Sequence, residues 1–337
     1  MKFYEINLQI FATQTTLLST PGNDLSPEMK TFYDKNLIRL AEPNLVHGQF
    51  GAAKPIPAGN GKKIEFRRAT PLTKVTTPLV ECVTPEGNKL DFTKFDAEVL
   101  QYGDYITQSD VLELTAIDNT IVEATNLLAN QAAVTLDTID RDALQMGTNV
   151  FYAPKADGTV VTSRAGLTKD CILTPDVIME VVAQLRSVNA PTIDGYYACI
   201  IHPHVALDIM LNDNWRKPHE YVNTENIYKG EIGEYGGVRF VQSSEAKIYG
   251  EGDDTPAGLA VYGTLIMGKD AYGTTEVEGG GLEMFVKQKG SAGTSDPLNQ
   301  RSSIGWKAMR VTTILVEDYL VRVESVSSKF SAKARKN

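Results

Sequence analysis

The chain has 337 residues, of which 42% are hydrophobic and 22% are charged, and its formal net charge is −9 at pH 7. These are ordinary globular values, and the length allows two intertwined domains or one core with long excursions. The acidic balance argues against a surface built mainly to grip phosphates, and no apolar run approaches the roughly 18 residues of a membrane helix. We therefore expect a globular protein with no membrane partner.

The N-terminal stretch MKFYEINLQIFATQ does not look like a signal peptide, because polar residues interrupt its apolar ones and no small-residue cleavage site follows. The three cysteines, Cys82, Cys171 and Cys199, are widely separated and form no CxxC pair. This spacing indicates neither a disulfide framework nor a zinc knuckle, and it favours folding in a reducing cytoplasm.

Residues 1–59 are predicted to form an N-terminal arm, with one short helix from Glu28 to Leu40 and several prolines that interrupt the rest. Residues 60–106 are predicted to form an extended two-stranded hairpin, because apolar and charged residues alternate around a turn signal at 85–88. Both strands of the hairpin are rich in polar residues and prolines, so it has no self-contained core. We expect it to lie on something else.

The strongest helix signal lies within residues 107–173. The sequence Thr107-Gln108-Ser109-Asp110 resembles a capping box, and apolar residues follow at three- and four-residue spacing until Gly147. A helix of about 37 residues would span on the order of 55 Å, which is several times the average length. We predict a long spine helix, followed by turn-rich β structure to residue 173.

Residues 174–262 are predicted to form an α/β subdomain. One helix begins at Thr174-Pro175-Asp176 and another at His202-Pro203, and the apolar run at 196–201 between them indicates a buried strand. Residues 263–337 are predicted to be mainly strands, which include the long alternating stretch at 309–327. The fold class is therefore α+β.

Several stretches resemble chemical sites but fit a structural role better. Gly263 to Lys269 matches the first seven positions of a phosphate-binding loop, yet its middle is apolar and Asp270 stands where Ser or Thr should bind magnesium. His202 and His204 diverge at a helix start, with no further ligand at a familiar spacing, so we expect a cap rather than a metal site. We predict no metal and no cofactor.

Catalysis has no convincing candidates either. Asp296, Glu317 and Asp318 could be paired as acid and base, but no histidine or nucleophile motif accompanies them, and we predict no catalytic residue and no enzyme. The basic residues at 329–336 are expected to form a solvated end, with contact to nucleic acid as the alternative.

The loop SAGTSDPLNQRSSIGWK at 291–307 is polar and densely specified although nothing in it can attack a substrate. Buried without partners, each such polar group would lose about 1–3 kcal/mol. We expect Asp296, Asn299, Gln300 and Arg301 to bond either across a subunit junction or within their own loop, and Trp306 to anchor the following strand.

The combination of segments is also similar to a known family. NLQIFA at 7–12, the hairpin, the spine helix and three further segments resemble the major capsid proteins of tailed bacteriophages, and more narrowly the branch typified by the capsid protein of podophage N-four. The three further segments are GEIGEYGGVRFVQSS at 230–244, IMGKDAYG at 266–273 and SDPLNQRSSIGWK at 295–307. The resemblance implies an extended loop at 60–106, a spine at about 108–147, an axial domain at 174–262 and peripheral-domain strands near the C-terminus.

The function implied is a non-enzymatic subunit that self-assembles, as hexamers and pentamers, into an icosahedral shell around double-stranded DNA. An encapsulin-like compartment and, more remotely, a nucleotide-binding enzyme are the alternatives. Portal, scaffold and decoration proteins are further expected partners, and the protein would be assembled in the host cytoplasm and reside in the virion.

Two sets of residues carry specific expectations within a shell. We expect Arg67, Arg68 and Lys74 in the hairpin to meet carboxylates of an adjacent subunit. We also expect the acidic positions of the spine to face partly inward, where they would limit DNA adhesion and leave only weak nonspecific contact. These positions are Asp110, Glu113, Asp118, Glu123, Asp137, Asp140 and Asp142.

Overall fold

The structure is a computed structural model that describes residues 45–337, except for 58, 60, 71, 79–80, 83, 85–86, 116–119, 213–214, 216–230 and 292–295. The expectations for residues 7–12 and for a helix from Glu28 to Leu40 lie outside the described residues. Within the described part, no helix is both long enough and apolar enough to cross a membrane.

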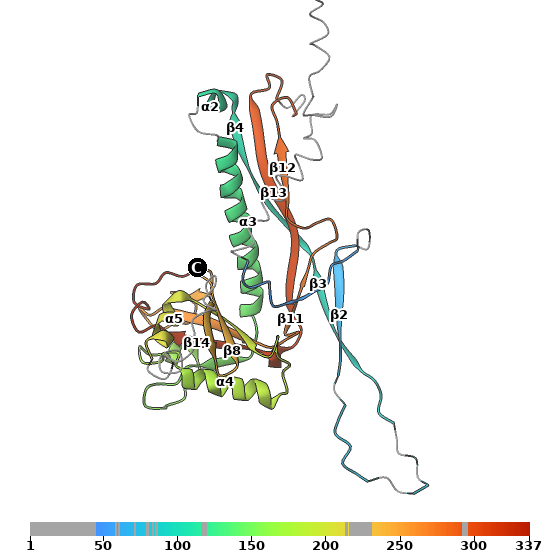
Figure 1. Ribbon diagram of the computed structural model, residues 1–337, viewed down its shortest axis with the longest axis vertical. Helices are drawn as coiled ribbons and strands as arrows, with labels where there is room; N and C mark the ends of the chain where they lie inside the picture. Colours follow the sequence, from blue (N-terminus) through green and yellow to red (C-terminus); the bar gives the residue numbers. More distant parts are fainter. Residues whose placement is uncertain are drawn as a thin grey trace, which may run out of the picture. The chain divides into compact units, whose positions relative to one another are not determined.

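The chain divides into two compact units, and three long elements contribute residues to both. The described part of the first unit comprises Tyr102–Ala132 and Leu282–Ala308, and the second comprises Pro43–Gln101, Ala133–Gly281 and Met309–Asn337. The shared elements are β4 (Leu100–Ser109), α3 (Thr120–Gln145) and β13 (Arg301–Ile314), drawn in Figure 1.

In the first unit, β13 pairs with β12 (Glu283–Lys287) and with β4. Met284 lies opposite Trp306 in the register of β12 and β13, and both are buried. The buried positions of α3 in this unit are mostly small, including Ala124, Ala129 and Ala132. Small side chains allow other elements to approach the helix backbone closely.

The beginning of the spine helix differs in detail from the expectation. Helix α2 (Asp110–Thr115) begins one residue after Ser109, whose hydroxyl oxygen accepts a hydrogen bond from the Leu112 amide at 3.3 Å. Ser109 is therefore the capping residue, two positions later than Thr107. Residues 116–119, between α2 and α3, lie outside the described set, whereas the predicted end before Gly147 is confirmed.

The second unit is built on a seven-stranded mixed sheet in the order β5-β14-β10-β6-β8-β7, with β9 beside β10. Strand β10 lies near its middle and is buried along its whole length. Figure 1 shows α4 and α5 beside this sheet. The strands are β5 (Val150–Tyr152), β6 (Tyr197–Ile201), β7 (Glu231–Tyr235), β8 (Val238–Gln242), β9 (Ile248–Tyr249), β10 (Val261–Met267) and β14 (Leu320–Val326).

Both helices of this unit begin where the sequence predicts. Helix α4 (Pro175–Ser187) is capped by Thr174, whose side chain accepts from the Val177 amide, and its apolar face is buried. Helix α5 (Pro203–Met210) is capped by His202, whose side chain accepts from the His204 amide. The predicted buried strand is β6, so both helix starts and this strand are confirmed, although the sheet that contains β6 also includes β5 and β14 from outside residues 174–262.

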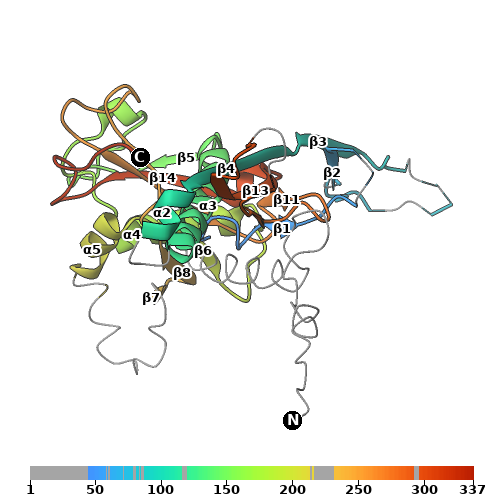
Figure 2. The same cartoon turned by 90° about the horizontal axis from the view of Figure 1, so that it is seen from above.

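The second unit also carries the hairpin and a short connecting strand. Among the described residues, strands β2 (Lys63–Ala69) and β3 (Phe92–Glu98) pair only with each other, as the antiparallel ribbon visible in Figures 1 and 2. Strand β1 (Ala52–Ala53) pairs with β11 (Tyr272–Thr275), which in turn pairs with β13. The predicted hairpin range of 60–106 therefore includes the first part of β4, which belongs to a different sheet.

The alternating stretch at 309–327 is not one strand. It is divided between β13 and β14 by a short 3-10 helix, η5 (Glu317–Tyr319). Strand β13 belongs to the five-stranded sheet and β14 to the seven-stranded sheet. Period-two alternation reports which face is buried but not which sheet receives the strand, so the sequence pattern alone misses this break.

Candidate intersubunit interface

The base of the hairpin is fastened to its own subunit. Phe66 in β2 is buried, and a Cβ added to Gly273 of β11 would lie only 2.8 Å from its ring. The guanidinium of Arg68 lies 5.6 Å from the centre of the Tyr319 ring, a cation–π contact. Arg67 forms an ion pair with Glu65 two positions earlier in the same strand. Arg67 and Arg68 thus have partners inside the chain.

The outer part of the hairpin is different, because its apolar side chains are exposed. Leu72, Val75 and Leu90 have exposed fractions of 61%, 75% and 67%. Lys74 lies between the first two and is exposed, with no ion-pair partner among the described residues. These exposed apolar side chains confirm that the outer hairpin lacks a core of its own. They also leave Lys74 between two uncovered apolar residues, Leu72 and Val75.

The polar loop before β13 is satisfied in part by itself. The carboxylate of Asp296 is buried and accepts a hydrogen bond from the Arg301 amide at 2.8 Å, while its main-chain oxygen accepts from the Asn299 amide. The Gln300 oxygen accepts from the Asp110 amide at 2.9 Å, which joins the loop to the start of α2. Asp296 is therefore satisfied within its own loop in the single chain, and its place at a subunit junction stays a prediction.

The outward face of the same loop remains uncovered. The side chains of Asn299, Gln300 and Arg301 are exposed, and neighbouring Leu298 has an exposed fraction of 75%. Asn299 adopts a φ of 52°, in the left-handed region that Asn tolerates better than most residues. Leu298 was not among the predicted site residues, although an apolar residue inside a polar loop is a signal of a contact surface.

Trp306 is an internal anchor. Its side chain is buried, and its indole Nε1 donates to Oε1 of Gln131 on α3 at 3.3 Å. The Gln131 amide group in turn donates to Asp104 on β4 at 2.6 Å, and this hydrogen bond lowers the pKa of Asp104. The chain Trp306–Gln131–Asp104 ties β13, α3 and β4 together within the first unit, as the expected anchoring role requires.

The expectation that the acidic spine residues line an interior is wrong for two of them. Asp137 and Asp140 are fully buried. Asp137 binds His47, and Asp140 binds Arg310 at 2.6 Å. Each carboxylate is held by a partner far away in the sequence, so neither can face a lumen. Glu123 is exposed, and the side chains of Glu113 and Asp118 lie outside those described.

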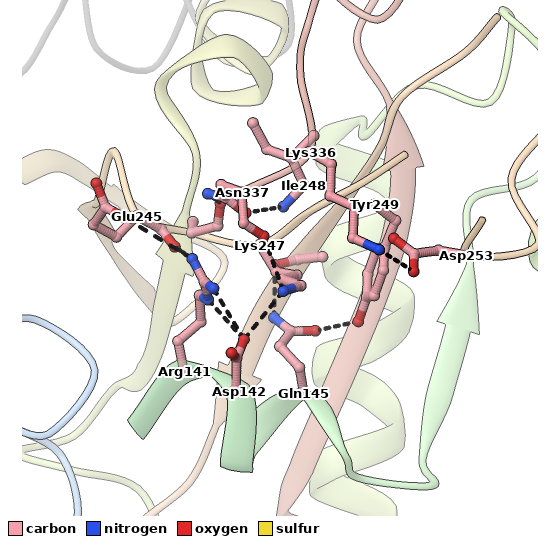
Figure 3. A network of polar contacts seen from close by, with 12 residues as sticks. Arg141, Asp142, Gln145, Glu245, Lys247, Ile248, Tyr249, Asp253, Lys336 and Asn337 are labelled. Atoms are coloured by element: carbon pink, nitrogen blue, oxygen red, sulfur yellow. Dashed lines mark hydrogen bonds and ion pairs between the residues drawn. The ribbon is translucent and has the colours of Figure 1, made fainter. Parts of the chain in front are cut away.

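The end of the chain is not a free basic tail. Asn337 accepts a hydrogen bond from the Ile248 amide and donates one to the Ala246 oxygen, and Lys336 pairs with Asp253 at 2.6 Å. Figure 3 shows how these contacts join a network at the end of α3. The network also contains Arg141, Asp142, Gln145, Glu245, Lys247 and Tyr249.

The same segment is anchored further back. Phe330 stacks on the His204 ring with 4.2 Å between ring centres, and Ser328 donates to the buried carboxylate of Asp208. Lys329, Lys333 and Arg335 are exposed along it. The expected solvated end is therefore correct for these three cations but wrong for the segment that carries them.

The residues that were considered and rejected as nucleotide-binding or metal sites have structural roles. Gly263 lies inside β10, and its oxygen accepts from Gln145, so the stretch is a strand and cannot fold around a phosphate. Burial lowers the pKa of His202 to about 4, with a smaller contribution from His204, and the neutral ring suits its capping role. No cluster of metal-ligating side chains occurs among the described residues.

The comparison with protein families gives one match. The sequence model of a family described as phage capsid protein matches residues 115–292, which is more than half of the chain. No curated protein sequence is similar enough to count as a match.

Solved structures match over most of the chain. The capsid of Ralstonia phage GP4 superposes with a TM-score of 0.65 at 13% identity, covering 86% of this chain and 89% of that one. The capsid of cyanophage Pam1 gives 0.62 at 12% identity, covering 86% and 92%. The virus-like particle of Pyrococcus furiosus gives 0.51 at 7% identity, covering 88% and 99%. At such identities the likeness shows the fold alone.

Proposed function

This chain belongs to the phage capsid protein family, and from that premise we propose that its neighbours in the shell are copies of itself, arranged as hexamers and pentamers around double-stranded DNA. The chain is a structural major capsid protein and not an enzyme, and its α+β fold is that of tailed-phage major capsid proteins. The narrower assignment to the podophage N-four branch stays a prediction.

The observation that carries the proposal is the uncovered outer hairpin. Leu72, Val75 and Leu90 are exposed on an element whose two strands pair only with each other. Covering an exposed Leu or Val contributes about 1.5–3 kcal/mol, so a neighbouring subunit that receives this surface would gain appreciable association energy. A ribbon of two strands is marginal in water by itself, which gives the hairpin a further reason to lie on a neighbour.

The polar residues that we propose for the interface are those whose side chains remain exposed in the single chain. We assign the leading role in the hairpin to Lys74, since Arg67 and Arg68 already have partners at the base. On the other unit, the exposed side chains of Gln300 and Arg301 remain candidates together with Asn299. Asp296 and Trp306 would support this surface from beneath rather than contact a neighbour.

Contacts with other virion components are also part of the proposal. A net charge of −9 favours weak, nonspecific contact with packaged DNA, because the 42 acidic residues outnumber the 33 Lys and Arg residues and repel phosphates. Portal, scaffold and decoration proteins are expected partners at assembly, which we place in the host cytoplasm, and the assembled protein resides in the virion.

The test is assembly of the purified full-length protein, followed by sedimentation and negative-stain microscopy. Closed shells, tubes or capsomers are the expected products, either alone or after addition of the other virion components. A compact monomer that persists at high concentration in both conditions would contradict the proposal.

An encapsulin-like compartment is the second candidate, and the fold similarity to the Pyrococcus furiosus particle is the observation in its favour. The contents of purified particles distinguish the two candidates, when the particles come from cells that also express the native partner proteins. Nuclease-protected DNA supports the capsid, whereas protein cargo without DNA supports the compartment.

A further inference from the structure

The segment that leads from residue 45 into the fold is held by a buried carboxylate, that of Asp137. Oδ1 of Asp137 accepts hydrogen bonds from the amides of Val46 and His47 at 2.8 and 2.7 Å, and Oδ2 lies 2.7 Å from Nδ1 of His47. The side chains of His47 and Asp137 are almost completely buried. One carboxylate on α3 therefore holds two successive residues of the incoming chain.

The next residue fits only because it is glycine. A Cβ on Gly48 would lie 2.1 Å from Nη2 of Arg310 and 2.7 Å from Oδ2 of Asp140. These two atoms form an ion pair of 2.6 Å, and Oδ1 of Asp140 also accepts from Thr312. Both neighbours are side chains, but they can move away from a new Cβ only by opening a pair in which Asp140 is buried.

Tyr272 makes further contacts with the same segment. Its hydroxyl donates to the His47 oxygen and accepts from the Phe50 amide at 3.2 Å, and its ring lies against Gly51. Beyond Gly51 the chain pairs with β11, where Ala52 lies opposite Gly273. Residues 45–51 thus pass from a buried carboxylate to a sheet, with main-chain contacts at both ends.

We propose that residues 45–51 form a preformed clasp, closed by Asp137 and dependent on glycine at position 48, which fixes the main chain of this segment in the conformation that assembly requires. Asp137 and Gly48 act as positioning residues: neither needs to touch a neighbouring subunit. The consequence for the shell rests on the proposed function, but the clasp itself is a property of the single subunit.

Hydrogen exchange of the unassembled, full-length subunit tests the clasp directly. In the native protein, the amides of Val46 and His47 should exchange far more slowly than in an unfolded chain, since both donate to a buried carboxylate. Exchange of these two amides at unfolded-chain rates would overturn the proposal without any variant.

Two variants then separate the clasp from general stability. Asp137→Ala removes the acceptor, and Gly48→Ala places a methyl group where the Arg310–Asp140 ion pair lies. Each variant should speed hydrogen exchange at Val46 and His47 by about tenfold or more. The matched control is Gly281→Ala, because a Cβ there would meet only Oε2 of Glu276 at 3.8 Å, an ordinary contact, and the residue lies outside the hairpin. Equal acceleration of the α3 amides between Leu136 and Leu144 would show a global effect and overturn a local clasp.

Assembly supplies the last readout. Gly48→Ala subunits should form closed, regular shells at a clearly lower yield than Gly281→Ala subunits, by particle counting in micrographs. Normal shells from a variant whose clasp has opened would refute the link between the clasp and assembly. Failure of the native protein to assemble would count against the proposed function, whereas the exchange results would stand independently.

Discussion

Arg164 and Glu324 form a two-pronged ion pair inside the second unit, with Nη2–Oε1 and Nε–Oε2 distances of 2.6 and 2.7 Å. Glu324 is fully buried in β14, and Arg322 approaches the same Oε1 to 3.0 Å. Arg164 also lies 3.6 Å from the centre of the Tyr249 ring. The hydrogen bond to Glu324 raises the pKa of Arg164, and the same carboxylate is the ion-pair partner of both guanidinium groups.

Replacing Glu324 should therefore destabilise the subunit strongly. Glu324→Ala removes the ion-pair partner of both arginines, and we expect a loss of about 3–5 kcal/mol in the free energy of unfolding, measured by urea titration. Glu251→Ala removes an exposed carboxylate elsewhere in the second unit and should change stability by less than about 0.5 kcal/mol. A loss below about 1 kcal/mol for Glu324→Ala would contradict this account.

Trp306 and Gln131 should prove energetically coupled. Trp306→Phe removes the indole donor to Gln131 but keeps most of the ring, and Gln131→Leu removes the acceptor. In a double-mutant cycle followed by urea unfolding, we expect a coupling energy of about 1 kcal/mol between the two positions. Additive effects, within about 0.3 kcal/mol, would mean that Trp306 anchors β13 by packing alone.

The lowered pKa of His202 leads us to expect that the stability of the subunit depends on pH. Burial lowers its folded-state pKa to about 4, below the ordinary value of 6.5, so the folded protein disfavours the protonated ring. The contribution of His202 is fully present above pH 6.5 and is lost as the pH falls from 6.5 towards 4, because the unfolded chain takes up the proton first. The slope from this one residue is at most about 1.4 kcal/mol per pH unit.

The variant His202→Asn isolates this effect. Asn caps a helix well, so α5 keeps its N-terminal hydrogen bond while the titrating group is removed. Urea unfolding at pH 7, 5.5 and 4.5 should show a shallower loss of stability in the variant than in the native protein. Parallel profiles would exclude His202 as a source of the acid sensitivity.

Local signals explain which parts of the fold could be predicted from the sequence. Thr174 and His202 are followed immediately by proline and an apolar helical pattern, so both helix starts depend on residues within one turn. The five residues of β6 are all buried, and an unbroken apolar run reports that directly. The end of α3 before Gly147 is local in the same sense.

Long-range partners explain what could not be predicted. Asp137 and Asp140 look like solvated positions of an amphipathic helix, but His47 and Arg310, 90 and 170 positions away, turn them into buried ion-pair partners. Asp296 differs again, because its partner is the Arg301 amide, five residues on, in a loop that no periodicity describes. A carboxylate has the same sequence signature whether it is solvated or paired, so burial of this kind depends on the completed fold.

The hairpin carries the last prediction. Leu72→Asp with Val75→Asp should leave urea unfolding of the isolated subunit nearly unchanged, since both side chains are exposed there, but it should reduce shell formation severely. The measurement is the fraction of protein in particles, determined by sedimentation. A double variant that assembles like the native protein would show that the outer hairpin is not covered by a neighbour.

Charge reversal in the same element distinguishes its two ends. Lys74→Glu should lower the particle fraction without altering the subunit, because Lys74 has no ion-pair partner among the described residues. Arg67→Glu with Arg68→Glu should also block assembly, but it breaks the pair with Glu65 and the contact with Tyr319, so it should loosen the hairpin base as well. Lys169→Glu is the control for net charge, since Lys169 is an exposed cation outside the hairpin. If Lys169→Glu reduces the particle fraction as much as Lys74→Glu does, the effect comes from total charge, and the hairpin cation has no special role in the interface.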